Sequence, residues 1–215
     1  MPFGFGRGRK DEPRPAAASP GATAGRRGPV AFDGLTEEWR LVGFMEIEGR
    51  LSDALNRRQP IHIHDVRWAP IDGSEPFTPA PGLGLVDPYD LIIVLAGEDT
   101  LPLLTEEEKA AHRVHKVPYD VALEVPPFRV IGTVYLHPGS DPGRLLERGT
   151  DMFVPVNDAV ALLGERQVND PAIGTILVNR FYLRGVEQVD KRTRTRAEPL
   201  PGRPLGGVSW RDTGR

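Results

Sequence analysis

WRLVGFMEI (residues 39–47) and FRVIGTVYL (residues 128–136) follow the same pattern within one chain. Each stretch begins with an aromatic residue and an arginine, continues with two aliphatic residues and a glycine, and ends mostly in residues that favour strands. Self-similarity of this kind is the sequence signature of a repeated architecture. The two stretches therefore predict two related structural units, each with a central strand that has a glycine inside it.

Two further pairs of stretches recur in the same order. GRLSDALN (49–56) resembles GRLLERGT (143–150), and IHIHDV (61–66) resembles VPVNDA (154–159). The offset between matched residues stays between 89 and 94, which one short insertion and one single-residue deletion account for. We therefore predict an internal duplication.

Each unit is predicted to contain a short strand, a longer strand, a brief helical stretch and then an alternating strand. The last strand is expected at YDLIIVLA (89–96) in the first unit and at GTILVNRFYLRGVE (174–187) in the second. No long helical segment separates the strands, which argues against a parallel α/β sheet. The predicted fold class is mostly β: two related antiparallel β units with pseudo-symmetry, a few short helices and disordered tails. A unit of roughly eighty residues is marginally stable alone, so the units are expected to share an interface.

Charge is distributed unevenly along the chain. Residues 1–29 carry a net charge of +4 and residues 191–215 carry +5, whereas the whole chain of 215 residues carries -3. Residues 30–190 must therefore carry -12. Both terminal segments are rich in Gly, Pro, Ala and Arg and poor in large apolar residues, a composition that predicts disorder.

The predicted organisation has five parts. They are, in order, a disordered basic tail (1–29), a first β repeat (30–100), a linker with a short helix (101–118), a second β repeat (119–190) and a disordered basic tail (191–215). The linker helix is expected to begin at Thr105, because Glu108 follows three residues later and the two form a capping box.

Composition limits the compartment and the chemistry. The chain has no cysteine, which excludes disulfides and thiolate chemistry and suits the cytoplasm. Its longest apolar run, LIIVLA (91–96), is far too short to span a bilayer. The first residues contain no apolar segment typical of a secretory signal. We expect a cytoplasmic protein with no membrane partner.

His62 and His64 lie two residues apart, so in a strand they would point to the same face, as paired imidazole ligands do. A catalytic zinc site needs a third protein ligand. The candidates are Asp65, His112, His115 and His137, and none has a spacing that completes a ligand set. Alternation with Ile61 and Ile63 is typical of a half-buried strand, and we favour that interpretation. A metal-binding protein or metal-dependent enzyme that uses His62 and His64 is the alternative hypothesis.

Residues that both units share are interpreted as serving the fold. Asp65 matches Asp158, and an aspartate at a strand end commonly bonds the backbone of the next turn. Gly43 matches Gly132, and a glycine inside a strand indicates a bulge or a close backbone crossing. The histidines have no counterpart in the second unit, so the fold does not require them.

Other motifs for chemistry are absent from the sequence. GLGLV (82–86) precedes a predicted strand, which is the wrong order for a dinucleotide-binding loop. No serine lies in a nucleophile-elbow context. Aromatic residues are sparse and the body is acidic, which disfavours nucleic-acid binding by the predicted sheet. We predict no catalytic residue and no cofactor.

The GRLSDALN turn followed by a strand that ends in aspartate resembles a small β domain of uncharacterised bacterial proteins. The matching residues of the first unit are Gly49, Arg50, Leu51, Ser52, Asp53, Leu55 and Asn56. The second unit keeps only Gly143, Arg144 and Leu145. The resemblance covers about a quarter of the chain and implies the fold and a bacterial setting, with no known activity. It marks Ser52, Asp53 and Asn56 as a patch; a helical turn capped by Ser and Asp side chains is the structural alternative.

The sequence thus favours a non-enzymatic scaffold or interaction protein that binds another macromolecule through β edges and basic tails. The predicted partner-binding residues follow the last strand directly: Lys191, Arg192, Arg194 and Arg196. Arginine forks suit phosphate or carboxylate oxygens. The charge of -12 on residues 30–190 opposes a polyanion, so a protein partner or self-association is favoured over nucleic acid.

Overall fold

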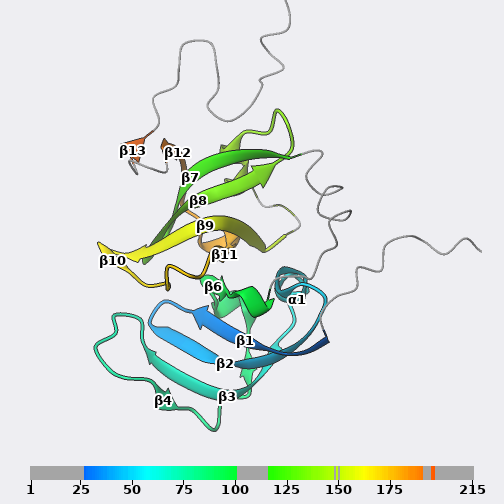
Figure 1. Ribbon diagram of the computed structural model, residues 1–215, viewed down its shortest axis with the longest axis vertical. Coiled ribbons are helices and arrows are strands. Elements are labelled where there is room, and N and C mark those ends of the chain that lie inside the picture. Colours follow the sequence, from blue (N-terminus) through cyan, green and yellow to red (C-terminus); the bar gives the residue numbers. More distant parts are fainter. Residues whose placement is uncertain (1–26, 101–115, 148, 150, 191–194, 197–215) are drawn as a thin grey trace, which may run out of the picture.

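The chain folds as an extended antiparallel β structure with few and short helices (Figure 1). The structure is a computed structural model that describes residues 27–100, 116–147, 149, 151–190 and 195–196. The predicted mostly-β class is confirmed. The linker helix expected from Thr105, and most of both basic tails, lie outside the described residues.

Two series of elements follow one another along the chain. The first series consists of β1 (Arg27–Leu35), β2 (Trp39–Glu48), α1 (Leu51–Asn56), β3 (Ile61–Pro70), β4 (Thr78–Pro79), β5 (Leu85–Val86), the 3₁₀ helix η1 (Pro88–Asp90), β6 (Ile93–Ala96) and η2 (Glu98–Thr100). The second consists of β7 (Val117–Val125), β8 (Phe128–Leu136), η3 (Pro142–Leu146), β9 (Phe153–Leu163), β10 (Arg166–Gln167), β11 (Thr175–Asn179), η4 (Arg180–Tyr182), β12 (Gly185–Asp190) and β13 (Thr195–Arg196).

The strand pairings of the first unit recur in the second. The β1–β2 hairpin places Phe32 opposite Gly43, and the β7–β8 hairpin places Val121 opposite Gly132. The third strand of each unit then pairs with the second, in β2–β3 and in β8–β9. Equivalent residues therefore face equivalent residues, as expected from a duplicated chain.

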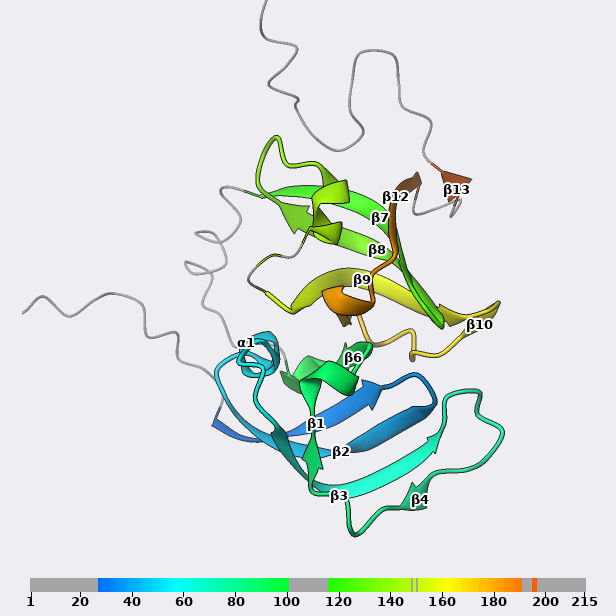
Figure 2. The same cartoon turned by 180° about the vertical axis from the view of Figure 1, so that it is seen from behind.

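The match extends to the end of each unit. Leu35 lies opposite Ile93 where β6 pairs with β1, and Glu124 lies opposite Gly185 where β12 pairs with β7. This register makes β12 the counterpart of β6. The order of the main sheet is β13-β12-β7-β8-β9-β11-β6-β1-β2-β3-β4, so the units lie side by side and meet at β6 and β11 (Figures 1 and 2).

Both third strands contain a bulge at the shared aspartate. The pairing register shifts at Gly43, where β3 has Asp65 and Val66 opposite one residue, and at Gly132, where β9 has Asp158 and Ala159 opposite one residue. The two aspartates have φ angles of 53° and 46°, a left-handed conformation that Asp tolerates better than most residues. They lie inside β3 and β9, so their predicted position at a strand end is wrong. The bulge predicted from the two glycines is confirmed.

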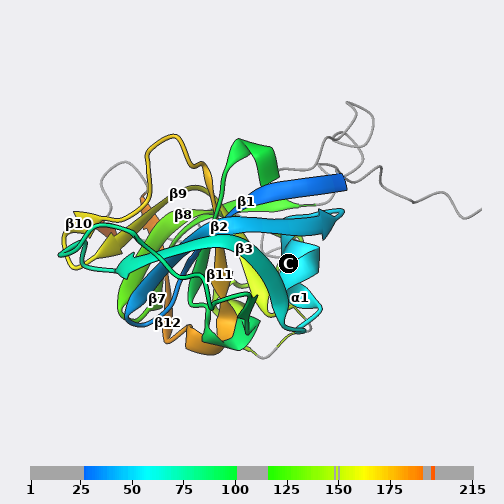
Figure 3. The same ribbon diagram turned by 90° about the horizontal axis from the view of Figure 1, so that it is seen from below.

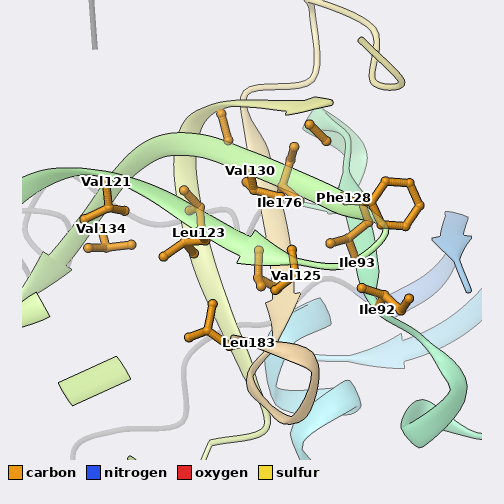
Figure 4. Close-up of a cluster of buried hydrophobic side chains, with 14 of the residues drawn as sticks. Ile92, Ile93, Val121, Leu123, Val125, Phe128, Val130, Val134, Ile176 and Leu183 are labelled. Atoms are coloured by element: carbon orange, nitrogen blue, oxygen red, sulfur yellow. The ribbon is translucent and has the colours of Figure 1, made fainter. Parts of the chain in front are cut away.

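Strands β6 and β11 are buried on both faces, because each side of their pair covers a different hydrophobic core. Ile93 and Leu95 of β6 enter the core of the second unit, whereas Val94 and Ala96 enter the core of the first. Figure 4 shows Ile93 among side chains of the second unit. A strand with two buried faces has a continuous apolar sequence, which explains the LIIVLA run.

The second unit ends differently from the prediction. The single strand expected at residues 174–187 is divided into β11, the turn η4 and β12. The division occurs because the Asn179 side-chain oxygen accepts a hydrogen bond from the Phe181 amide (3.0 Å) and so caps a helical turn. In the first unit the strand expected at residues 89–96 is likewise shorter, because η1 occupies its start.

We expect Gly132→Ala to destabilise the protein by about 1–3 kcal/mol, because the added methyl group overpacks the bulge. A Cβ atom at Gly132 would lie 2.8 Å from the carbonyl oxygen of Asn157 and 2.9 Å from Cβ of Ala159. Urea unfolding followed by circular dichroism measures the change. The control is Gly82→Ala, where a Cβ atom meets nothing within 4 Å. An equal effect of both substitutions would contradict the close approach.

Candidate functional site

Two short helical turns, η1 and η4, meet where the units join. Each turn begins with a side-chain cap. The Oδ1 atom of Asp87 accepts a hydrogen bond from the Tyr89 amide (2.9 Å), and the Oδ1 atom of Asn179 accepts one from the Phe181 amide. An aromatic residue thus occupies the same position of the same turn in both units. Figures 2 and 3 show η1 (green) and η4 (orange) side by side.

The sequence contains a further signal for this correspondence. VDPYDL (86–91) and VNRFYL (178–183) align at an offset of 92, close to the offset of 93 that relates Asp65 to Asp158. The match is weak because the middle positions differ in charge and size. Its preserved features are the Asx cap, the aromatic residue two positions later and the final leucine.

The caps differ because only one of them is buried. Asn179 is fully buried, and its amide nitrogen donates to the carbonyl oxygens of Leu91 (2.7 Å) and Pro88 (3.4 Å). The Asp87 side chain is exposed and acts only as an acceptor. A buried cap that must also donate requires an amide, since an ionised carboxylate has no N–H or O–H to give.

The two aromatic rings stack on one another at the surface. The ring centroids of Tyr89 and Phe181 are 5.6 Å apart with an angle of 21° between the planes. Their exposed fractions are 45% and 38%. The guanidinium carbon of Arg58 lies 5.7 Å from the centroid of the Phe181 ring. We call Tyr89, Phe181 and Arg58 the seam surface.

Hydrogen bonds hold the seam surface in place. The Tyr182 hydroxyl donates to the carbonyl oxygen of Tyr89 (3.0 Å), which joins η4 to η1. Burial raises the pKa of Tyr182, and the negative charges of Asp90 and Glu37 add to this effect. The phenol therefore remains a neutral donor over the physiological range.

The patch suggested by the GRLSDALN resemblance has a structural component. Asn56 makes two hydrogen bonds with the backbone of Phe153, accepting from its amide (2.7 Å) and donating to its carbonyl oxygen (3.3 Å). Asn56 therefore joins α1 to the second unit. The structural alternative, a turn capped by Ser and Asp side chains, is not found at the start of α1, because the capping residue is Arg50 and no side-chain hydrogen bond caps the helix. Ser52 is half-buried and Asp53 is exposed.

The histidine pair lies on an exposed face of β3. The His64 ring stacks against Phe44 of the neighbouring strand, with 5.8 Å between centroids. No group of three or more His, Cys, Asp or Glu residues that could hold a metal ion occurs in the part of the chain that the structure describes. His62 and His64 are not brought together with a third ligand there.

The predicted basic partner-binding segment is described only at its end. Lys191, Arg192 and Arg194 lie outside the described residues. Arg196 belongs to β13, whose backbone pairs with Val189 and Asp190 of β12. Arg196 therefore lies next to the last strand of the second unit, as the sequence suggested. Its role in partner binding stays a prediction.

Comparison with known proteins identifies no relative. No protein-family model, no curated protein and no solved structure matches the chain. Among the described residues, no helix is both long and apolar enough to cross a membrane.

Asn179→Asp is expected to lower the free energy of unfolding by about 3 kcal/mol at neutral pH. The substitution buries a charge and removes the donor to the Leu91 carbonyl oxygen. Asp87→Asn is the matched control and should change stability by less than about 0.5 kcal/mol, because this cap is exposed. Urea unfolding at pH 7 compares the two variants. Equal effects would show that burial does not decide the choice of cap.

Tyr182→Phe should cost about 1 kcal/mol at pH 8 through loss of the hydrogen bond to Tyr89. Because the folded-state pKa of Tyr182 is raised above 10.0, its stabilising effect is complete below the unfolded pKa and is lost as the pH rises through the folded pKa. The native protein should therefore lose more stability than the variant between pH 8 and pH 11 in urea unfolding. Burial also raises the pKa of Tyr119. The Tyr182→Phe variant should therefore still lose some stability between pH 8 and pH 11, but less than the native protein. An identical loss in both proteins would contradict this role of Tyr182.

Proposed function

We propose that the protein is a non-enzymatic scaffold that binds another protein, with the seam surface as the main contact. The supporting observation is the stack of Tyr89 on Phe181 beside the Arg58 guanidinium, with both aromatic residues more than one-third exposed. Tyrosine and arginine are enriched among the residues that contribute most to protein–protein affinity. Aromatic rings supply a large apolar contact area, and the guanidinium supplies directional hydrogen bonds.

The seam surface is pre-organised for binding. The two caps fix the turns that carry the rings, and the Tyr182 hydroxyl links these turns. Rings that are already held in position lose little conformational entropy when a partner covers them, so more of the interaction energy is available for affinity.

Each unit contributes one ring, which connects the proposed function to the duplication. Tyr89 comes from the first unit and Phe181 from the second, so the stack exists only while the units are joined. A partner that binds both rings would stabilise the joined units as well. The duplication thus provides a contact that a single unit lacks.

Strand addition and the basic tails are secondary routes in this proposal. The strands at the ends of the main sheet, β4 and β13, are two residues long each, which limits how many backbone hydrogen bonds a partner strand could form there. Residues 191–196 would add electrostatic attraction to an acidic partner. The net charge of -12 on residues 30–190 favours a protein over nucleic acid.

We expect Tyr89→Ala and Phe181→Ala each to weaken partner binding at least tenfold, or about 1.4 kcal/mol. Partners captured by the full chain from a lysate of its source cells, and identified by mass spectrometry, would be compared between variants and then measured by calorimetry. Tyr135→Ala is the control, because Tyr135 is 48% exposed but lies on β8 away from η1 and η4. Unchanged binding by folded Tyr89→Ala and Phe181→Ala variants would refute the seam surface as the contact.

A further inference from the structure

The first unit has a sheet face that carries exposed apolar side chains. Strands β1, β2 and β3 lie side by side (Figure 1), and one of their faces shares a hydrophobic core with α1 and β5. The opposite face, which we call the outer face, carries Phe44, His62, His64 and Leu85. Phe44 is 45% exposed and Leu85 is 50% exposed. Apolar side chains that gather on one exposed face mark an interaction surface.

Strand pairing brings these side chains together. Phe44 lies opposite His64, and their rings stack with 5.8 Å between centroids. Leu85 lies opposite His62. Because residues two apart in a strand point to the same face, the two pairs form one continuous patch across β2, β3 and β5. We call Phe44, His62, His64 and Leu85 the outer patch.

The second unit shows that the fold does not require such a patch. At the positions equivalent to Phe44 and His64 it has Thr133 and Asn157, which also lie opposite one another. Thr133 is buried, and its hydroxyl donates to Oδ1 of Asp120 (2.7 Å). The same place in the sheet is thus occupied by polar side chains. The exposed aromatic pair is a property of the first unit alone.

The second unit also covers part of its outer face, whereas the first does not do so in the same way. Val189, near the end of β12, packs with Ile131 on the outer side of β8. The register that makes β12 the counterpart of β6 matches Gly185 with Ile93, so Val189 corresponds to Gly97. Glycine has no side chain to lay over the sheet. The outer face of the first unit is therefore left for a separate occupant.

Hydrogen-bonding groups differ between the two central strands of this face. Glu46 of β2 comes directly after Met45, whose partner on β3 is Ile63. Continuing the register by one residue places Glu46 opposite His62, and both residues are exposed. On this face β2 therefore presents a carboxylate that accepts hydrogen bonds, and β3 presents an imidazole that can donate one.

The outer face is complementary to a second copy of itself. A two-fold axis parallel to the strands, between β2 and β3, would place β2 of each copy on β3 of the other. Phe44 would then contact His64 of the second copy, and Glu46 would accept a hydrogen bond from the second copy's His62. Stacked sheets pack about 10 Å apart, a distance that side chains from both faces fill.

We propose that the outer patch is the interface of a two-fold symmetric dimer of this chain, with β2 of each copy on β3 of the other. A purely apolar partner surface is disfavoured as the occupant, because it would bury Glu46 without a hydrogen-bond donor. A nucleic acid would be repelled by the same carboxylate. The proposal is independent of the seam surface, since it involves none of its three residues.

Sedimentation velocity of the full chain at neutral pH, over a range of concentrations, measures the association. The outer patch is small, so we expect a weak dimer with a dissociation constant of about 10–100 µM. Phe44→Ala and Leu85→Ala should each weaken the dimer about tenfold. Leu146→Ala is the matched control and should leave it unchanged, because Leu146 is 46% exposed but lies in η3 of the second unit.

Charge exchange tests the pairing between copies. Glu46→Lys removes the acceptor for the second copy's imidazole, and His62→Glu places two carboxylates opposite one another. Each substitution alone should weaken the dimer about tenfold, whereas the two together should restore it, because opposite charges then face each other. Circular dichroism verifies that every variant is folded.

A parent chain that stays monomeric at about 500 µM would overturn the proposal. A dimer that Phe44→Ala and Leu85→Ala leave unchanged would do so as well, because its interface would lie elsewhere. A double variant that associates no better than the single ones would contradict the placement of β2 on β3. Association that a chelator abolishes would also overturn the proposal, since a metal ion shared by the histidines would then hold the copies together.

Discussion

The pairing of β6 with β11 is the interaction on which the rest of the structure depends. Four residue pairs join these strands, from Ile93 with Val178 to Ala96 with Thr175. Their side chains alternate between two cores, so the same short ladder supplies apolar surface to both units. A unit without its neighbour would expose one face of this pair to water, at a cost of roughly 25 cal/mol for each Å² of apolar surface. The two units are therefore expected to fold together.

The stack of Tyr89 on Phe181 is a consequence of that pairing. Once β6 and β11 are aligned, the turns η1 and η4 lie next to each other, and the buried Asn179 amide bonds the backbone of the first unit. Duplication thus places two copies of one turn in contact. The surface they form has no equivalent within either unit alone, which makes it a natural location for a function acquired after duplication.

Much of the fold could be predicted from the repeated stretches, because Gly43 and Gly132 occupy equivalent positions opposite the bulges in β3 and β9. The ends of the units were harder to predict. β5 pairs with β3 as β11 pairs with β9, but β5 has two residues and β11 has five. The seam surface could not be predicted, because ring stacking between Tyr89 and Phe181 depends on how the units are joined. The histidines, by contrast, were correctly placed on a polar strand face, since local alternation alone determines that property.

The correspondence between β12 and β6 limits how many units can be joined in a row. At the positions where β6 presents Ile93 and Leu95 to the neighbouring unit, β12 has Gly185 and Glu187. Arg129 lies 3.7 Å from the Glu187 carboxylate. A third unit that docked on β12 as the second docks on β6 would have to bury this carboxylate, at a cost on the order of several kcal/mol. The edge of β12 therefore disfavours the addition of a third unit in the way that the second unit is added to β6.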